Sequence, residues 1–271
     1  EDRFGEFGLT VRGNMTYSKN EILDYDIEDN VYPYQFQTGF RVDQVRGLIA
    51  EGLFKDYDDI RTSPKQMFGA VQPGDIKYKD VNGDGIVDGG DEVAIGATRT
   101  PNLIYGLGIS MTWRGLDVNL HFQGAGKSTF PINGKCVYAF SEGSWGQVFD
   151  GLVSNRWVDS ETAAKIGIPA NEDPNAAYPR LSYGGNSNNY RQSTYWLRDG
   201  RYLRLKNLDI GYTLPKRWVN KAHLNNVRLF IQGTNLLTWS KFDTWDPEMG
   251  SSNGEAYPIT KAVTAGLQIN L

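Results

Sequence analysis

The stretch Leu103-Ile-Tyr-Gly-Leu-Gly-Ile-Ser-Met-Thr-Trp113, followed by Arg114-Gly115 and by Leu116-Asp-Val-Asn-Leu-His-Phe122, decides the architecture of this chain. Apolar residues alternate strictly with small or polar residues in both halves. A helix would break such a pattern within one turn, so the pattern predicts extended strands. The dipeptide Arg114-Gly115 is short enough for a tight turn between them. The sequence therefore predicts two long antiparallel strands that follow one another directly.

Four further segments repeat the period of two, so six strands are expected in total. They lie at 6–17, 207–213, 227–234 and 263–271. The longest segments have the length of tilted membrane-spanning strands, about 9–11 residues, whereas soluble strands average about 5–6. Aromatic rings mark segment ends, as expected for rings at a membrane surface; they are Tyr17, Trp113, Tyr212 and Trp239. The pattern favours a membrane β-barrel, but a soluble sheet with one buried face alternates in the same way.

The expected connections alternate between short and long. The long ones cover 18–100, 124–199 and 240–257. Outer-membrane barrels combine short periplasmic turns with long outer loops, so if Leu271 ends at the periplasm, all three long connections lie outside. Six strands cannot close a membrane barrel, and an open sheet edge is not viable in lipid. Residues 1–271 are therefore expected to be a section of a larger barrel, unless the protein is not a membrane barrel.

Composition limits the possible chemistry. The chain has 271 residues, with 28 Lys and Arg against 32 Asp and Glu, and the net charge of −4 argues against a nucleic-acid partner. The single cysteine, Cys136, cannot form an internal disulfide. His121 and His223 are the only histidines and leave little for histidine-based catalysis. We assign no catalytic residue, and the high content of glycine and aromatic residues suits a large β architecture.

One loop has the spacing of a calcium site. The segment Asp80-Val-Asn-Gly-Asp-Gly-Ile-Val-Asp-Gly-Gly-Asp91 matches an EF-hand loop, in which short oxygen ligands on alternate residues converge on one hard cation. Strand-forming residues rather than a helix pair surround it, so we expect a structural calcium ion that staples the loop 80–91. An Asn/Asp/Gly turn without metal is the alternative. The expected ligands are Asp80, Asn82, Asp84, the Ile86 carbonyl, Asp88 and Asp91.

Two other patterns point to function less directly. Gly124-Ala-Gly-Lys-Ser-Thr129 imitates a P-loop, but the first glycine and the following helix that such a loop requires are missing. The long connections are rich in aromatic residues, which suit stacking on sugars or peptides but also suit packing of the loops against each other. No substrate-binding residue is assigned. The loop aromatics are Trp145, Trp157, Tyr178, Tyr183, Tyr190, Tyr195 and Trp196.

Several motifs together resemble one protein family. They include the run from Gly74 through Gly85 to Gly96, and Trp196-Leu-Arg-Asp-Gly-Arg-Tyr-Leu-Arg-Leu-Lys-Asn-Leu208 with the following Gly211-Tyr-Thr-Leu-Pro215. The set also includes Gly233-Thr-Asn-Leu-Leu-Thr-Trp239 with Asp246-Pro-Glu248, and Gly52-Leu-Phe54 leading into Ser63-Pro64. In their order along the chain they resemble the C-terminal part of SusC/RagA-type TonB-dependent outer-membrane transporters of Bacteroidota.

The resemblance implies a fold and a function. It implies that 1–271 belongs to a 22-stranded barrel that imports oligosaccharides or peptides with energy from a TonB protein. A SusD-like surface lipoprotein would cap the barrel, and outer-membrane lipid would surround it. The family's plug, TonB-contacting segment and earlier strands are absent from this sequence, and Leu271 stands where an aromatic residue is usual. We therefore expect a non-enzymatic transporter segment; the alternatives are a soluble calcium-binding adhesin or binding module and, third, a glycan-degrading enzyme.

Overall fold

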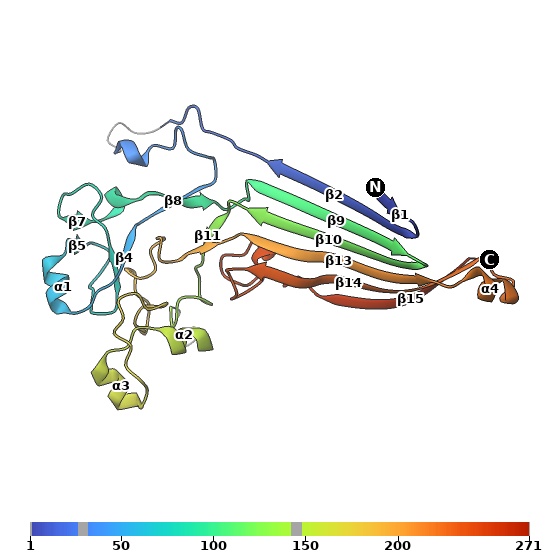
Figure 1. The fold of residues 1–271 in the computed structure, drawn as a ribbon. Helices are drawn as coiled ribbons and strands as arrows, with labels where there is room; N and C mark the ends of the chain where they lie inside the picture. The colour runs from blue at the N-terminus through green and yellow to red at the C-terminus, as the bar shows by residue number, and fades with distance from the viewer. Residues whose placement is uncertain (1, 27–31, 142–147, 271) are drawn as a thin grey trace.

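A single long antiparallel sheet organises the chain. The computed structural model describes residues 2–26, 32–141 and 148–270, and the sheet lies beside a region of loops and short elements (Figure 1). Its strand order is β1-β2-β9-β10-β13-β14-β15, and each strand pairs with the next one along the chain in this sheet. The strands are β1 (Asp2–Phe4), β2 (Phe7–Tyr17), β9 (Leu103–Trp113), β10 (Leu116–Gly126), β13 (Tyr202–Thr213), β14 (Asn226–Ser240) and β15 (Ala262–Asn270).

The register places all the alternating apolar residues on the same face. In one row across the sheet, Val11 pairs with Ile109, Ile109 with Leu120 and Leu120 with Leu208. The next row of residues along the strands pairs polar or glycine positions instead, such as Asn119 with Ser110. The six predicted strands are therefore confirmed, with one face apolar and the other polar.

The structure differs from the predicted strands in two respects. It adds a seventh strand, β1, which turns back on β2 through Gly5 and Glu6. In the structure β13 and β14 also extend beyond the alternating segments. A β-bulge lies between Leu205 and Asn207, where the alternation of β13 ends. The bulge resets which side chains face each side, so the alternation stops there although the strands continue.

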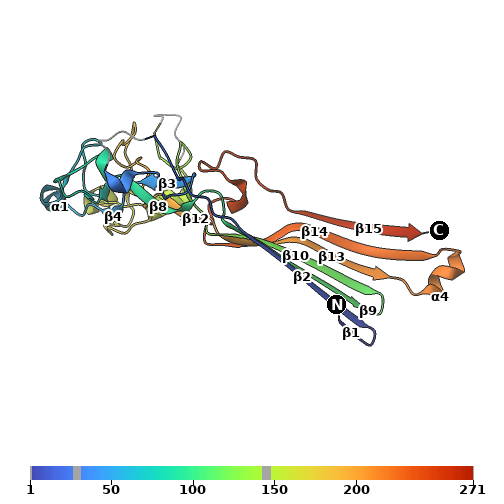
Figure 2. The same ribbon diagram turned by 90° about the horizontal axis from the view of Figure 1, so that it is seen from above.

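The long connections gather at one end of the sheet. The tight turns, the segment with helix α4 (Lys216–Val219) and both chain termini lie at the opposite end (Figures 1 and 2). None of the described helices is both long enough and apolar enough to cross a bilayer. The connections form a layer of short elements, which we call the loop layer: β3 (Gln44–Gly47), β4 (Ala50–Leu53), β5 (Lys65–Gln66), β6 (Ile76–Tyr78), β7 (Ile86–Val87), β8 (Val93–Thr98), β11 (Thr129–Pro131), β12 (Leu197–Asp199), α1 (Tyr57–Thr62), α2 (Asp150–Asn155), α3 (Ser160–Ile166), and the 3-10 turns η1 (Pro33–Gln35), η2 (Gly89–Asp91) and η5 (Pro247–Met249).

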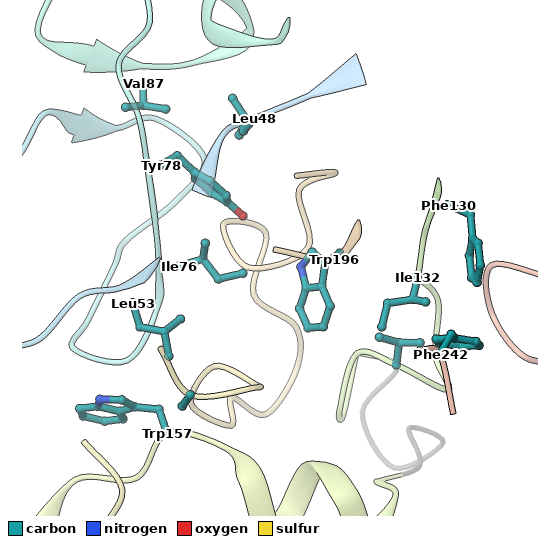
Figure 3. Close-up of a cluster of buried hydrophobic side chains, with 12 residues drawn as sticks. Leu48, Leu53, Ile76, Tyr78, Val87, Phe130, Ile132, Trp157, Trp196 and Phe242 are labelled. Carbon is teal, nitrogen blue, oxygen red and sulfur yellow. The ribbon is translucent and has the colours of Figure 1, made fainter. Parts of the chain in front are cut away.

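The hydrophobic core lies in the loop layer and not on the sheet. Its side chains come from all three long connections, as Figure 3 shows for Ile76, Trp196 and Phe242. Phe130 packs edge-on against Phe242, with ring centroids 5.1 Å apart. The loop layer is therefore one packed unit. The cluster comprises Leu48, Leu53, Ile76, Tyr78, Val87, Phe130, Ile132, Val137, Trp157, Ala176, Trp196 and Phe242.

Gly74 sits where any side chain would disturb this core. Its φ is +84°, and an added Cβ would lie 2.2 Å from Cε3 of Trp157. We expect Gly74→Ala to destabilise the loop layer by about 1–3 kcal/mol, because the indole must shift in a packed core. Chemical denaturation followed by tryptophan fluorescence measures this loss. Gly83→Ala is the control, since it has a similar φ of +76° and nothing within 4 Å of the added Cβ; an equal loss in both variants would contradict the packing argument.

Candidate functional site

The polar face of the sheet is hollowed between β2, β9, β10 and β13. Glycines create the space: a Cβ on Gly106 would lie 2.4 Å from the side-chain oxygen of Asn14. His121 lies in this groove, on the polar side of its strand. The groove has a volume of about 430 Å³ and is lined by Arg12, Gly13, Asn14, Gly106, Gly108, Ser110, Asn119, Leu120, His121, Asn207 and Asp209.

A charged network fixes the polar face next to this groove. The Arg228 guanidinium donates hydrogen bonds to the carboxylates of Asp117 and Asp209. It lies against Gly211, where a Cβ would be 2.2 Å from Nη2 of the arginine. Gln232 Nε2 donates a 2.6 Å hydrogen bond to Asp209. Three neighbouring strands are thus linked by ionic contacts on this side of the sheet.

The opposite face is apolar and uncovered. Trp113 and Tyr212 lie near the end with the tight turns, whereas Tyr17 and Trp239 lie near the loop layer. Aromatic rings at both ends of an apolar band are typical of a sheet that crosses a bilayer. Large apolar side chains on this face are 38–73% exposed; they are Val11, Met15, Tyr17, Leu107, Trp113, Leu116, Ile210, Tyr212, Leu229, Ile231, Leu237, Trp239, Val263, Leu267 and Ile269.

Buried polar contacts hold the loop layer together. Asp75 is fully buried and accepts hydrogen bonds from the side-chain amides of Asn186 (3.0 Å) and Asn189 (2.9 Å). Arg180 Nε lies 2.8 Å from Oδ1 of the same carboxylate. This cluster, which we call the Asp75 hub, joins the first long connection to the second. No local motif in the sequence marks this cluster, because Asp75 lies more than 100 residues from each of these partners.

A second ionic contact joins the third connection to the sheet. Arg204 on β13 is 1% exposed and bonds both oxygens of Asp246, at 2.5 and 2.6 Å. Lys206, the extra residue at the bulge, donates a 2.9 Å hydrogen bond to Glu248. The bulge therefore directs a cation toward the third connection at the point where the sheet meets the loop layer.

The predicted calcium loop folds as a tight turn. The Asp80 carboxylate accepts hydrogen bonds from the amides of Gly83 (2.6 Å) and Gly85 (2.9 Å). Asp84 accepts one from the Ile86 amide at 2.9 Å, and Asn82 accepts one from the Asp84 amide at 3.0 Å. These bonds draw the side chains at the first, third and fifth positions toward the loop backbone.

The last two predicted ligands differ in their role. Asp88 caps the η2 turn by accepting a 2.7 Å hydrogen bond from the Gly90 amide. Asp91 is fully buried, and its two oxygens accept amide hydrogen bonds from Val81 (2.7 Å) and Asp88 (2.9 Å). Asp91 thus closes the loop through the backbone. Within the described residues, no three His, Cys, Asp or Glu side chains are grouped so that they could hold a metal ion.

The P-loop imitation and most of the aromatic residues in the long connections form parts of strands or of the packed loops. Residues 124–126 of the P-loop imitation continue β10, and Thr129 begins β11, so no helix follows. Most loop aromatics pack the loops together, as one of the two interpretations expected: Trp157 and Trp196 are core residues, and Tyr178, Tyr190 and Tyr195 contact other rings. Tyr183 is 75% exposed. Trp145 and Leu271 lie outside the described residues.

Comparison with known proteins finds relatives of this chain. The chain is 29% identical over 280 residues to TonB-dependent receptor P26 of Formosa agariphila. This chain is a homologue of TonB-dependent receptors. It is also 27% identical to TonB-dependent receptor P3 of the same organism and 23% identical to TonB-dependent receptor SusC of Bacteroides thetaiotaomicron, each over 74% of the chain. No family model matches. The resemblance to SusC/RagA-type receptors is confirmed.

Solved structures show the same fold. A structure of the RagAB peptide transporter superposes on 99% of the chain with a TM-score of 0.70 at 20% identity, and the RagAB peptide importer in its open-open state gives the same TM-score. The sheet therefore has the fold of a section of a larger transporter barrel, as predicted. The chain spans 26% of the length of the P26 relative and 28% of the matched transporter chain.

Proposed function

We propose that this chain forms part of the wall and the outer loops of an outer-membrane TonB-dependent importer of oligosaccharides or peptides. The observation that carries the proposal is the two-sided sheet. Its apolar face is uncovered and bounded by aromatic rings, while its polar face is hollowed and holds charged groups. Lipid suits the first face and an aqueous lumen suits the second.

The sheet edges support a larger barrel. The outer edge of β15 has no strand beside it among the described residues, and β1 pairs only with Phe7–Leu9 of β2. Unpaired backbone groups are costly in lipid, so the remaining strands of the transporter are proposed to pair at these two edges. A plug and a TonB-contacting segment would belong to the same transporter. The soluble adhesin alternative requires a second layer over the apolar face, and no described residue supplies one.

The position of the loops suggests how the partners are arranged. All long connections meet at one end and share one core, which makes a broad platform. We place this platform on the cell surface beneath a SusD-like lipoprotein, and the α4 end in the periplasm. An epitope inserted after Tyr183 in the full-length protein should be accessible on intact cells, and one inserted in α4 should require permeabilisation. The reverse labelling would contradict this orientation.

Transport itself is tested in cells that carry the full-length protein. Uptake of fluorescent oligosaccharides and of fluorescent peptides is compared between the parent strain, an in-frame deletion and a strain depleted of TonB. The proposal predicts that one ligand class is lost in both mutants while the other is retained. Uptake that is unchanged in the deletion strain for both classes would contradict import through this protein.

We also propose that the loop 80–91 binds a structural calcium ion through Asp80, Asn82, Asp84, the Ile86 carbonyl and Asp88, with the carboxylates of Asp80, Asp84 and Asp88 turning from the loop backbone toward the ion. No basic side chain is paired with these carboxylates among the described residues, so a cation would relieve their mutual repulsion. The η1 segment packs on this loop, with Tyr34 Oη donating a 2.6 Å hydrogen bond to the Gly90 carbonyl. Asp91 contributes by closing the loop rather than by contacting the ion.

Calcium binding is expected to stabilise the loop layer. At a calcium concentration 100 times the dissociation constant, the gain in unfolding free energy is about 2.7 kcal/mol. Thermal unfolding with calcium and with EDTA measures the gain, and metal analysis gives the stoichiometry. Asp84→Ala should abolish the gain, whereas Asp58→Ala, an exposed carboxylate in α1, should keep it. No bound metal at millimolar calcium would end this proposal.

A further inference from the structure

A groove in the loop layer lies between α1, α3 and the segment that precedes the Asp75 hub. Its volume is about 630 Å³, within the range of small-molecule sites of about 300–1,000 Å³. Tyr57 of α1 and Ile166 of α3 line it and are 64% and 54% exposed. Arg156 and Trp157 line it as well, although both are almost completely buried. The groove is separate from the polar face of the sheet and from the loop 80–91.

Arg156 is the unusual residue of this groove. It is 7% exposed, and its guanidinium donates a hydrogen bond to the Val153 carbonyl, a neutral acceptor. No carboxylate is paired with it among the described residues. Burial lowers the pKa of Arg156 from its ordinary value, because removal from water disfavours the charged form. A buried cation with no counter-charge is costly, and an anion beside it would offset that cost.

The other charged groups that line the groove are already satisfied. Arg180 is paired with Asp75, and Lys165 with Glu161 at 2.6 Å. Asp159 caps α3 by accepting a 2.8 Å hydrogen bond from the Thr162 amide. Arg156 is thus the one lining charge without a partner in the part of the chain that the structure describes.

Trp157 forms a fixed wall of the groove next to Arg156. A Cβ added to Gly74 would lie 2.2 Å from Cε3 of its ring, so the indole packs directly on that backbone. A guanidinium binds carboxylate or sulfate oxygens in pairs, so Arg156 suits an anionic group with several oxygens.

We propose that this groove binds an anionic group of a ligand, a carboxylate or sulfate, with Arg156 as its counter-charge and Tyr57 as an apolar wall. The inference rests on the proposed function in one respect, since an imported oligosaccharide or peptide would bring the anion. An acidic sugar and an acidic side chain of a peptide offer the same chemistry.

Isothermal titration of the full-length protein in detergent tests the site with three probes. Digalacturonate and triglutamate carry the anion on a sugar and on a peptide, and the dimethyl ester of digalacturonate is the neutral control. We expect an acidic probe to bind and the ester to bind at least tenfold more weakly. Binding of only one acidic probe supports the site and identifies the source of the anion.

Variants then locate the binding. Arg156→Gln should lower the affinity for the acidic probe at least tenfold. Tyr57→Ala, a change at an exposed position that cannot unfold the core, should lower this affinity several-fold. Arg61→Gln removes the same charge from exposed α1 outside the groove and should leave affinity unchanged. Equal binding of the ester, or equal loss in Arg61→Gln and Arg156→Gln, would overturn the proposal. If neither acidic probe binds while the protein still inserts into vesicles, this inference fails and the proposed function stands.

Discussion

Ile231→Lys is expected to weaken the folding of the full-length protein into lipid vesicles by about 2–4 kcal/mol, the cost of a lysine near the middle of a membrane barrel. Ile231 is 55% exposed on the apolar face, and its ladder neighbours are Ile210 and Ala265. In lipid, the lysine must be drawn toward the interface or lose its charge. Urea titration of the vesicle-inserted protein measures the difference in free energy.

The matched control for this variant lies one residue along the same pair of strands. Thr264→Lys places the same charge on the polar face, where Thr264 pairs with Gln232 next to the carboxylate of Asp209. It should change the folding free energy by less than about 1 kcal/mol, because the side chain stays hydrated. Equal effects of the two lysines would show that the two faces have the same surroundings, contrary to the account.

Asp75→Ala is expected to destabilise the loop layer by about 3–5 kcal/mol, because it leaves a cation without its buried partner. Arg180 would lose its carboxylate, and the amides of Asn186 and Asn189 would lose their acceptor in a buried site. The first and second long connections would separate at this point. Hydrogen exchange of the loop layer measures the loss, with the sheet as an internal reference.

The location of this effect matters as much as its size. The sheet strands should keep their protection in Asp75→Ala, since the hydrogen bonds and ion pairs of the hub among the described residues all lie within the loop layer. Asp58→Ala provides the control: its ion pair with Arg61 is exposed, and such pairs contribute about 0–1 kcal/mol. Uniform deprotection of sheet and loops in Asp75→Ala would contradict the separate roles of the two parts.

Sequence alternation predicted the sheet well where each strand keeps one face toward each environment. It failed at Lys206, because a bulged residue reverses the faces while the strand continues. It also ended β10 too early: Gly124 has no side chain, and the Tyr105 ring occupies that space. Both errors arise from pairing between strands, which a single strand's sequence does not contain.

The loop layer was less predictable for a related reason. The spacing of Asp80, Asn82 and Asp84 is visible locally, so that loop could be identified from sequence. Asp75 resembles any acidic turn residue until Asn186 and Asn189 are brought to it from the second connection. Arg156 likewise has no sequence signal, since its significance comes from burial without a counter-charge.

Spin labels along β15 report directly what surrounds each face of the sheet. Single cysteines replace residues 263–268 of β15 one at a time in the full-length protein with Cys136→Ser, and each carries a nitroxide spin label in lipid vesicles. We expect a period of two: labels at 263, 265 and 267 collide with lipid-dissolved oxygen, and labels at 264, 266 and 268 with a water-soluble nickel complex. Preferential access of the nickel complex to 263, 265 and 267, or shielding of these positions from both reagents, would contradict a lipid-facing apolar side.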